Sequence, residues 1–279
     1  MKVDLVIWAK NGSATLPRVL KRINEVIPKE VMHNRIFVDD NSTDDSKEIA
    51  DSFGWKIYDN EGKGIGDGAN TALRHVTTPY FISVEQDVVF AQDWWEKIPP
   101  HLNKPKVVAA QGIRLPDHPV LHKLQEFRIE RYKTLKGYKI TQSIDNTIFK
   151  TKVIRELGGF PYLPGAGVDS ILVQKVFRAG YQWITDYNVI SVHLRKSVWQ
   201  DVKHTYWYGR AASIVSRFDP NVNFRRVVAM FFFSPIRGLQ IALKKNCPQI
   251  VFVYPLMRFM ALKGYMDGRK NREKTFLMY

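Results

Sequence analysis

The amino-acid sequence predicts an α/β protein, with a mostly parallel sheet covered by helices on both faces and amphipathic helices at its C-terminal end. Three observations support this prediction. The first 90 residues alternate four times between a short apolar run and a segment of helical periodicity. Acidic or small residues follow several of the predicted strands. The composition changes near residue 195, where basic and aromatic residues become frequent.

The first four strands are predicted from short apolar runs. Val3–Trp8 is continuous apart from Asp4, which is typical of a strand buried on both faces. The other three runs are Arg35–Val38, Trp55–Tyr58 and Tyr80–Val84. Apolar residues at helical spacing predict a helix in each interval, and these helices are Leu16–Ile27, a segment ending at Phe53, and Ala69–Val76.

Further strands and helices follow before the composition changes. The predicted strands are Val107–Gln111, Ser143–Phe149 and Gln182–Val192. The predicted helices are Leu121–Lys136, Lys152–Leu157 and Val168–Ala179. No internal repeat or low-complexity segment interrupts this order, so the sequence favours one α/β domain up to residue 195.

The net charge of +15 is unevenly distributed over the 279 residues. From Arg195 to Tyr279 there are 16 Lys and Arg residues against 4 Asp and Glu, together with 15 of the 35 aromatic residues. Basic and aromatic residues together favour an anionic partner, either nucleic acid or an acidic membrane surface. We therefore predict two regions, an α/β domain over residues 1–195 and a basic, aromatic-rich helical region over residues 196–279.

Three helices are predicted in the basic region, at Lys203–Phe218, Phe224–Lys245 and Pro248–Tyr265. Their uncharged runs are shorter than the ~18–20 residues that a membrane-spanning helix needs. We expect them to lie in the membrane interface, with Lys and Arg at the headgroups and Phe, Leu and Met below. The alternative is an ordinary helical subdomain packed on the sheet.

The compartment is predicted from two features. The single cysteine, Cys247, excludes an internal disulfide and suits a reducing environment. The N-terminal apolar run Val3–Trp8 is too short for a signal peptide. The expected location is therefore the cytoplasmic face of a membrane, with peripheral attachment and no spanning helix.

Carboxylates follow two of the predicted strands directly. Glu85 and Asp87 come after Tyr80–Val84, and Asp39 and Asp40 come after the second strand. Ligands of open α/β sheets bind outside the carboxyl ends of the strands, and acidic groups there suit a hard divalent cation. The alternative is structural, because acidic residues also cap the helices that follow such turns.

Five segments of the chain correspond, in order and spacing, to motifs of a known family. They are Val6–Gly12, Phe37–Asp44, Gly64–Leu73, Glu85–Asp87, and Gly158–Phe160 with Gly167–Asp169 and Leu172. With these segments the chain resembles the family 2 glycosyltransferases of the GT-A fold, whose motifs include VDDGSTD, GxGxAxNxG, DxD and GGF…GED..L. The resemblance covers residue 3 to about residue 210, and the segment at 38–44 is its most specific part.

The resemblance implies an inverting, metal-dependent glycosyltransferase that uses a nucleotide-diphosphate sugar. Asp87 would coordinate Mg2+ or Mn2+, and His193 stands at a position that often contacts the metal or the diphosphate. Asp169 would be the general base that deprotonates the acceptor hydroxyl. The alternatives are a half-buried strand histidine for His193 and a helix N-cap for Asp169.

The resemblance also implies contacts with the nucleotide. Asp40 would accept a hydrogen bond from the base, Ala9 would line the base pocket, and Gln86 would lie near the ribose. Lys63 and Gly66 in the glycine-rich segment would contact the nucleotide as well. For this last segment the alternative is a flexible surface turn.

The sequence departs from the family pattern at three positions. Trp8 replaces the usual Pro and is expected to alter the packing around the base. Glu85 replaces the first Asp of the DxD motif, keeps its charge on a longer arm, and is expected on the nucleotide side of the site. Val168 replaces the common acid before the base, which removes a neighbour that could raise the pKa of Asp169.

Two segments of the basic region, Lys203–Arg210 and Arg258–Tyr265, resemble family members that act on lipid-linked acceptors. The implied acceptor is a polyprenyl phosphate, a diphosphate-linked sugar or another phosphate-bearing molecule at an anionic membrane surface. One alternative is a sugar-phosphate nucleotidyltransferase, although Ala9–Gly12 lacks the Gly-rich loop with Arg and Lys of that class. Another is a non-catalytic basic protein that binds membrane or RNA. No nucleic-acid motif occurs, so no nucleic-acid partner is expected.

Overall fold

The computed structural model describes residues 1–134, 142–163, 166–195 and 197–270, and its chain forms two compact units. The first unit contains Met1–Arg114, Thr141–Pro164 and Val168–Leu194, and the second contains Leu115–Ile140, Gly165–Gly167 and Arg195–Tyr279. The end of the helix predicted over Leu121–Lys136 and residues 271–279 of the basic region lie outside the described residues.

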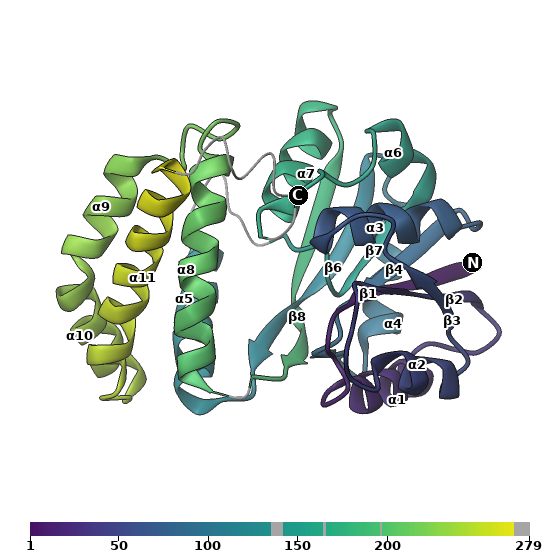
Figure 1. Ribbon diagram of the computed structural model, residues 1–279, viewed down its shortest axis with the longest axis horizontal. Helices are drawn as coiled ribbons and strands as arrows, with labels where there is room; N and C mark the ends of the chain where they lie inside the picture. Colours follow the sequence, from purple (N-terminus) through teal and green to yellow (C-terminus); the bar gives the residue numbers. More distant parts are fainter. Residues whose placement is uncertain (135–141, 164–165, 196, 271–279) are drawn as a thin grey trace. The chain divides into compact units, whose positions relative to one another are not determined.

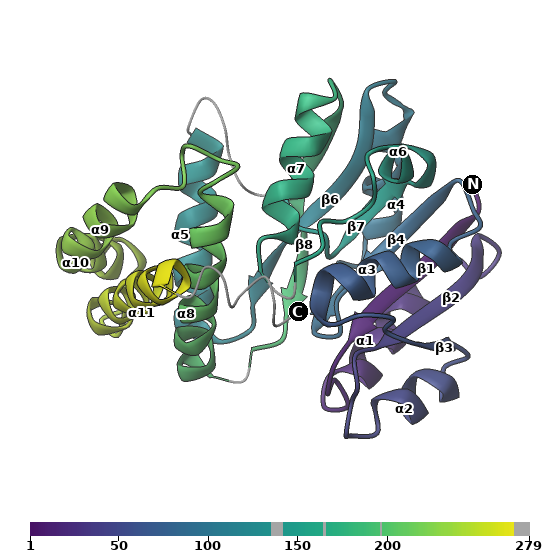
Figure 2. The same cartoon turned by 45° about the horizontal axis from the view of Figure 1, so that its top comes forward.

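An eight-stranded sheet forms the centre of the first unit, in the order β3-β2-β1-β4-β7-β6-β8-β5. The strands are β1 Val3–Ala9, β2 Met32–Asp39, β3 Lys56–Asp59, β4 Tyr80–Val84, β5 Val88–Val89, β6 Val107–Pro116, β7 Thr147–Lys150 and β8 Gln182–His193. The strands β1 to β4 are parallel neighbours, and Figure 2 shows β1 between β2 and β4. β7 is antiparallel to β4 and β6, and β5 is antiparallel to β8.

Helices cover both faces of this sheet (Figure 1). One face carries α1 Leu16–Val26, α2 Ser46–Ser52, α4 Trp94–Lys97 and the short 3-10 helix Pro99–Asn103, and the other carries α3 Gly64–His75, α6 Thr151–Glu156 and α7 Val168–Arg178. Leu5 and Ile7 of β1 enter the first core, and Val6 and Trp8 enter the second, as strand alternation requires. The predicted α/β fold class is confirmed.

Asp4 is the one charged residue inside β1, and it is fully buried. Its carboxylate accepts hydrogen bonds from the backbone N–H groups of Asn34 at 2.9 Å, Thr77 at 2.6 Å and Thr78 at 3.0 Å. A buried carboxylate is tolerated where several donors satisfy it. Asp4 thereby ties the start of β1 to β2 and to the turn before β4.

Two predicted elements of the first unit are wrong in ways that affect the site. The strand predicted over Ser143–Phe149 begins only at Thr147, because Asn146 has φ 51° and left-handed backbone cannot continue a strand. The helix predicted over Ala69–Val76 begins earlier, at Gly64, so the glycine-rich segment forms the start of α3 and the alternative of a surface turn does not hold. Residues 143–146 therefore form a bend whose side chains face other elements.

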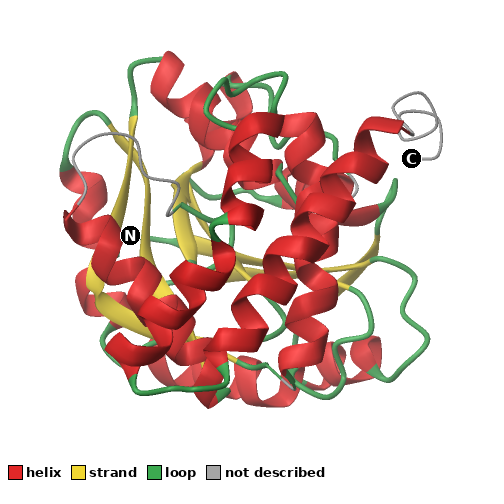
Figure 3. Cartoon of the chain, turned by 90° about the vertical axis from the view of Figure 1, so that its left-hand side faces the viewer, coloured by secondary structure: helices red, strands yellow, loops and turns green. Residues whose placement is uncertain are grey.

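The second unit consists of helices, which lie side by side in Figure 3. Its helices are α5 Pro119–Thr134, α8 Val198–Val215, α9 Phe224–Phe232, α10 Ser234–Lys245 and α11 Ile250–Lys270. Gly209 of α8 and Gly264 of α11 allow these two helices to pack backbone to backbone. A Cβ on Gly209 would collide with the carbonyl oxygen of Ala261, and one on Gly264 with that of Tyr206.

The single helix predicted over Phe224–Lys245 is wrong, because it is broken into α9 and α10 with a bend of 59°. Pro235 lies in the first turn of α10, where it lacks an N–H and its ring would clash with a preceding carbonyl in a continuous helix. Within the described parts of the chain, no single helix is long and apolar enough to cross a membrane. The bent pair α9 and α10 meets those criteria only when both helices are counted together.

Candidate functional site

The carboxyl ends of three neighbouring strands bring most of the predicted site residues together in the first unit. Ala9 ends β1 and pairs with Asp39 at the end of β2, and Ile7 of β1 pairs with Val84 at the end of β4. The segment that carries Glu85 and Asp87 follows Val84 directly. The parallel register therefore places the predicted nucleotide and metal residues along one edge of the sheet.

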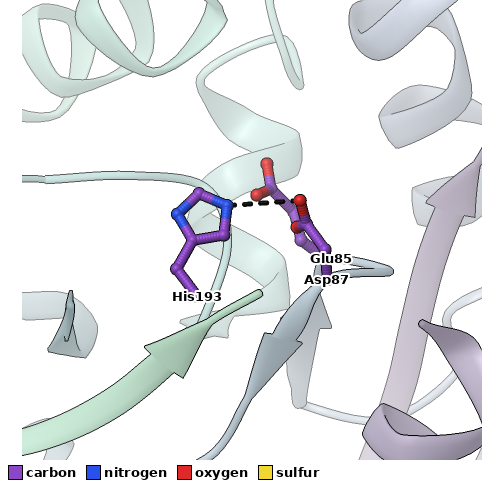
Figure 4. A group of neighbouring side chains, drawn as sticks. All are labelled: Glu85, Asp87 and His193. Carbon is purple, nitrogen blue, oxygen red and sulfur yellow. Dashed lines mark hydrogen bonds and ion pairs between the residues drawn. The ribbon is translucent and has the colours of Figure 1, made fainter. Parts of the chain in front are cut away.

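Glu85, Asp87 and His193 form a cluster at this edge (Figure 4). One potential ligand atom from each residue lies within 4.8 Å of the other two. The His193 Nε2 atom is 3.2 Å from Asp87 Oδ2, and the imidazole is buried whereas the Asp87 side chain is 24% exposed. The cluster thus has a closed side at the histidine and an accessible side at the carboxylates.

The pairing of β5 with β8 assembles this cluster. Val88 pairs with His193, and the backbone N–H of Leu194 donates to the carbonyl of Asp87 at 2.8 Å. The two carboxylates precede β5 in the turn after β4, so the same pairing brings them to the histidine. Carboxylate oxygens are the preferred ligands of Mg2+ and Mn2+, and imidazole is a common additional ligand of transition metals. The donor set therefore fits a divalent cation.

Asp39 and Asp40 differ in how their carboxylates are used. The carboxylate of Asp40 accepts from Asn60 Nδ2 at 2.8 Å and from the backbone N–H of Gly64 at 3.2 Å, at the start of α3. Asp39 is buried, and its Oδ2 accepts from the backbone N–H of Ser42 at 3.1 Å. Its Oδ1 has no hydrogen-bond partner among the described residues. Asp40 therefore orients the glycine-rich helix, and Asp39 retains an acceptor for a further donor.

Gln86 connects the turn after β4 to the turn after β1. Its Oε1 accepts from the backbone N–H of Lys10 at 3.1 Å, and its Nε2 donates to the carbonyl of Lys10 at 3.2 Å. Gly12 lies so close that a Cβ would be 2.8 Å from Gln86 Oε1. The amide of Gln86 thus has a structural role in this position, and its predicted contact with the ribose stays a prediction.

Lys63 and Gly66 lie at the start of α3. Lys63 is exposed, and its backbone N–H donates to Asp67 Oδ2 at 3.2 Å. Gly66 is buried against the chain that follows Phe160: its N–H donates to the carbonyl of Leu163 at 2.9 Å, and a Cβ would collide with the carbonyl of Pro161. Gly66 is therefore required for close packing, whereas the side chain of Lys63 is open to solvent.

Asp169 lies in the first turn of α7 and is half-buried. Burial raises the pKa of its carboxyl above the ordinary value, and the negative charge of Glu85 raises this pKa as well. Its own backbone N–H and the guanidinium of Arg114 act in the opposite direction but do not cancel the effect of burial. A carboxyl group with a raised pKa is better matched to accepting a proton near neutral pH.

Three residues of this group were not predicted from the sequence: Ser143, which contacts Asp169, and Arg114 and Asp145, which contact Ser143. Arg114 Nη1 donates to Ser143 Oγ at 2.8 Å and forms an ion pair with Asp145 Oδ2. Ser143 Oγ lies 3.3 Å from Asp169 Oδ2. The sequence held one signal for this group, namely the polar residues Asp145 and Asn146 inside a run that was predicted to be a strand.

Comparisons with known proteins identify the family. A model of the family described as "Glycosyl transferase family 2" matches residues 4–158. No curated protein sequence matches the chain. Solved structures resemble it at low sequence identity, so the likeness concerns the fold.

Three of these structures are informative. A mannosyltransferase from Pyrobaculum calidifontis, in complex with GDP-Man and Mn2+, has a TM-score of 0.62 and 20% identity over 96% of this chain and 75% of that one. Staphylococcus aureus TarS with UDP-GlcNAc has a TM-score of 0.54 and 13% identity over 98% and 92%. Glucosyl-3-phosphoglycerate synthase from Mycobacterium tuberculosis, with Mn2+, UDP and phosphoglyceric acid, has a TM-score of 0.56 and 17% identity over 77% and 78%. Since the family model covers more than half of the chain, the protein belongs to glycosyltransferase family 2 and is a glycosyltransferase with the GT-A fold.

Proposed function

We propose that the protein is an inverting, metal-dependent enzyme that transfers a sugar from a nucleotide-diphosphate donor to a lipid-linked or other phosphate-bearing acceptor. The proposal rests mainly on the cluster of Glu85, Asp87 and His193 at the strand ends, whose donor atoms fit one divalent cation. The structure of the similar mannosyltransferase contains GDP-Man and Mn2+, and that of the similar glucosyl-3-phosphoglycerate synthase contains phosphoglyceric acid, UDP and Mn2+. These complexes support the classes of donor, metal and acceptor.

In the proposed reaction, Asp87 and His193 hold Mg2+ or Mn2+, with Glu85 beside them. When bound, the cation offsets the negative charge that develops on the leaving diphosphate. Asp169 accepts the proton of the acceptor hydroxyl while the acceptor oxygen forms a bond to the anomeric carbon. The bond from that carbon to the diphosphate breaks, and its electron pair leaves with the diphosphate. A single displacement of this kind inverts the anomeric centre.

The nucleotide is proposed to lie over the ends of β1 and β2. Ala9 would line the base pocket, and Gln86 would lie next to the ribose from its fixed position on Lys10. Asp40 is proposed to accept from the base, and the unpartnered Oδ1 of Asp39 offers a second acceptor at the same place. The remaining proposed contacts, Lys63 and Gly66, come from the start of α3.

The basic helices are proposed to attach the enzyme to an anionic membrane surface at its cytoplasmic face. Large apolar side chains on three helices of the second unit are exposed, and the most exposed are Phe232, Phe233, Ile236, Leu243 and Phe252. Basic residues lie on the same elements, among them Arg225, Arg226, Arg237 and Lys244. Exposed apolar side chains flanked by Lys and Arg are typical of helices that lie in a membrane interface. We propose that the region over residues 196–279 serves this attachment and the acceptor.

A thermal-shift panel tests the nucleotide and metal site. We expect GDP or UDP to raise the melting temperature only when Mn2+ is present, because the cluster would hold the cation and the cation would supply the positive charge that attracts the diphosphate. Asp87→Asn should remove this shift, and Asp40→Ala should remove or reduce it. Asp93→Asn, which alters a carboxylate paired with Lys97 on α4, should keep it. A shift that is independent of Mn2+ and equal in Asp87→Asn would contradict the proposed site.

Sedimentation with vesicles tests the membrane proposal. The chain should sediment with phosphatidylcholine vesicles only when they also contain phosphatidylserine. The double variant Phe232→Ser with Phe252→Ser should weaken this binding by about 10-fold or more, because each Phe side chain contributes on the order of 1.5–3 kcal/mol when fully buried. Ile190→Ser changes an exposed apolar residue of the first unit and serves as the control. Equal sedimentation with neutral vesicles, or an unchanged double variant, would refute this attachment.

A further inference from the structure

Ser143 lies at the junction of three charged side chains of the first unit. Its Oγ is 2.8 Å from Arg114 Nη1, 2.8 Å from Asp145 Oδ2 and 3.3 Å from Asp169 Oδ2. Ser143 is buried, and its backbone N–H donates to Gln111 Oε1 at 2.8 Å, which fixes the bend that carries it. The hydroxyl therefore has a fixed position, but it cannot form hydrogen bonds with all of these neighbours at once.

The hydrogen-bonding capacity of a hydroxyl group limits the possible arrangements. A serine hydroxyl donates one hydrogen and accepts at two lone pairs. Arg114 can only donate, so Ser143 accepts from it. The single hydroxyl hydrogen can then point to Asp145 or to Asp169, but not fully to both.

Asp145 does not depend on this hydrogen. It is 1% exposed, and it forms a direct ion pair with Arg114 that persists whichever way the hydroxyl points. A buried carboxylate with an arginine partner remains charged and satisfied. Arg114 and Asp145 thus form a fixed support, and Ser143 is the one group in this set that can reorient without breaking an ion pair.

We propose that Ser143 is a positioning residue for Asp169, supported by the pair of Arg114 and Asp145. While Asp169 is a carboxylate, the Ser143 hydroxyl donates to its Oδ2 and holds it in the orientation that receives the acceptor proton. Once Asp169 has taken that proton, its neutral carboxyl is a weaker acceptor, so the hydroxyl turns its hydrogen to the charged carboxylate of Asp145. No proton leaves the set in this step. This inference rests on the proposed role of Asp169 as the base.

The test compares Ser143→Ala with the wild type in the release of GDP from GDP-mannose and of UDP from UDP-N-acetylglucosamine, with Mn2+ and water as the acceptor. Ser143→Ala should lower kcat by about 10-fold and leave KM for the donor unchanged, because a base that is poorly oriented slows only the chemical step. Ser143→Thr keeps the hydroxyl and should restore most of kcat. Asp169→Asn should lose more, about 10²–10⁴-fold.

Thr151→Val is the matched control for stability. Thr151 is buried in the same unit, and its hydroxyl donates to the carbonyl of Thr78 at 2.8 Å, next to the start of β4. This variant loses one buried hydroxyl bond, as Ser143→Ala does, but should keep kcat. Should Ser143→Ala not fold, Ser143→Cys offers a side chain of similar size with a weak donor, and the same loss of kcat is expected.

The outcomes separate this inference from the proposed function. If Asp169→Asn lowers kcat and Ser143→Ala does not, the positioning role of Ser143 is refuted and the role of Asp169 as the base is not. Equal losses of kcat in Ser143→Ala and Thr151→Val would overturn it too, because a general loss of stability would explain both. Turnover that survives Asp169→Asn would overturn the role of the base, and the inference with it. No nucleotide release by the wild type from either donor would refute the proposed donor chemistry.

Discussion

Replacing Asn70 by alanine is expected to destabilise the first unit strongly. The side chain of Asn70, on α3, forms two hydrogen bonds with the backbone of a single residue. Its Nδ2 donates to the carbonyl of Phe160 at 2.8 Å, and its Oδ1 accepts from the N–H of Phe160 at 2.9 Å. Asn70 is 5% exposed and Phe160 is 1% exposed, so water does not reach these groups in the folded chain. Alanine leaves both backbone groups buried without partners.

The expected loss follows from the number of groups left unpaired. A buried donor or acceptor without a partner costs about 1–3 kcal/mol, so the two groups of Phe160 together cost ~2–6 kcal/mol of the free energy of unfolding. Asn34→Ala is the matched control. Asn34 is half-buried, and its Nδ2 donates to the side chain of Thr77 at 3.0 Å, where water can replace it. Its loss should stay within about 1 kcal/mol.

Urea unfolding of the wild type and both variants measures these losses, and amide hydrogen exchange reports the local effect. In Asn70→Ala, the amide of Phe160 should exchange faster than in the wild type, whereas Asn34→Ala should leave it unchanged. The reasoning is refuted if Asn70→Ala is no less stable than Asn34→Ala and the Phe160 amide keeps its protection.

Three further predictions concern the site. His193→Ala should weaken Mn2+ binding by at least about 10-fold in calorimetry, and an unchanged affinity would show that His193 is not a metal ligand. EDTA should abolish the metal-dependent thermal shift of the wild type. Because burial raises the pKa of Asp169 in the folded chain, the wild type should lose stability as the pH rises from the ordinary pKa of Asp through this raised pKa. Urea unfolding at several pH values measures this loss, and Asp169→Asn should not show it. Parallel pH dependence in both proteins would contradict that assignment. Gly66→Ala should cost about 1–3 kcal/mol in the same assay, because its Cβ collides with the Pro161 carbonyl, and a fully stable variant would argue against this close approach.

The spacing of the motif segments along the chain does not show which of them contact one another. Asn70 lies in the segment that resembles GxGxAxNxG, and the structure shows that it holds the backbone of Phe160 in the GGF segment. Gly159 has φ 72°, and a Cβ there would lie 2.5 Å from Asn70 Oδ1. These two segments therefore belong to one packing contact, which spacing along the chain cannot reveal.

The sequence by itself determined the fold class and the edge of the sheet that carries the acidic groups. Both follow from local periodicity, because alternating strands and helices require a covered parallel sheet, and a residue that follows a strand lies at that strand's end. It also determined the basic and apolar character of the C-terminal helices, although not their break at Pro235.

Only the tertiary structure decided how the site residues are brought together. The resemblance assigned Asp87 and His193 to the metal, and the structure shows how they meet across 106 residues. The strand β5, whose two residues are too few for a sequence pattern to identify, pairs with β8. Ser143 reaches Asp169, and Asp145 reaches Ser143, because Asn146 turns the chain and delays the start of β7 to Thr147. Contacts of this kind depend on register and on single backbone angles, and the energies that select them come from neighbours far apart in the sequence.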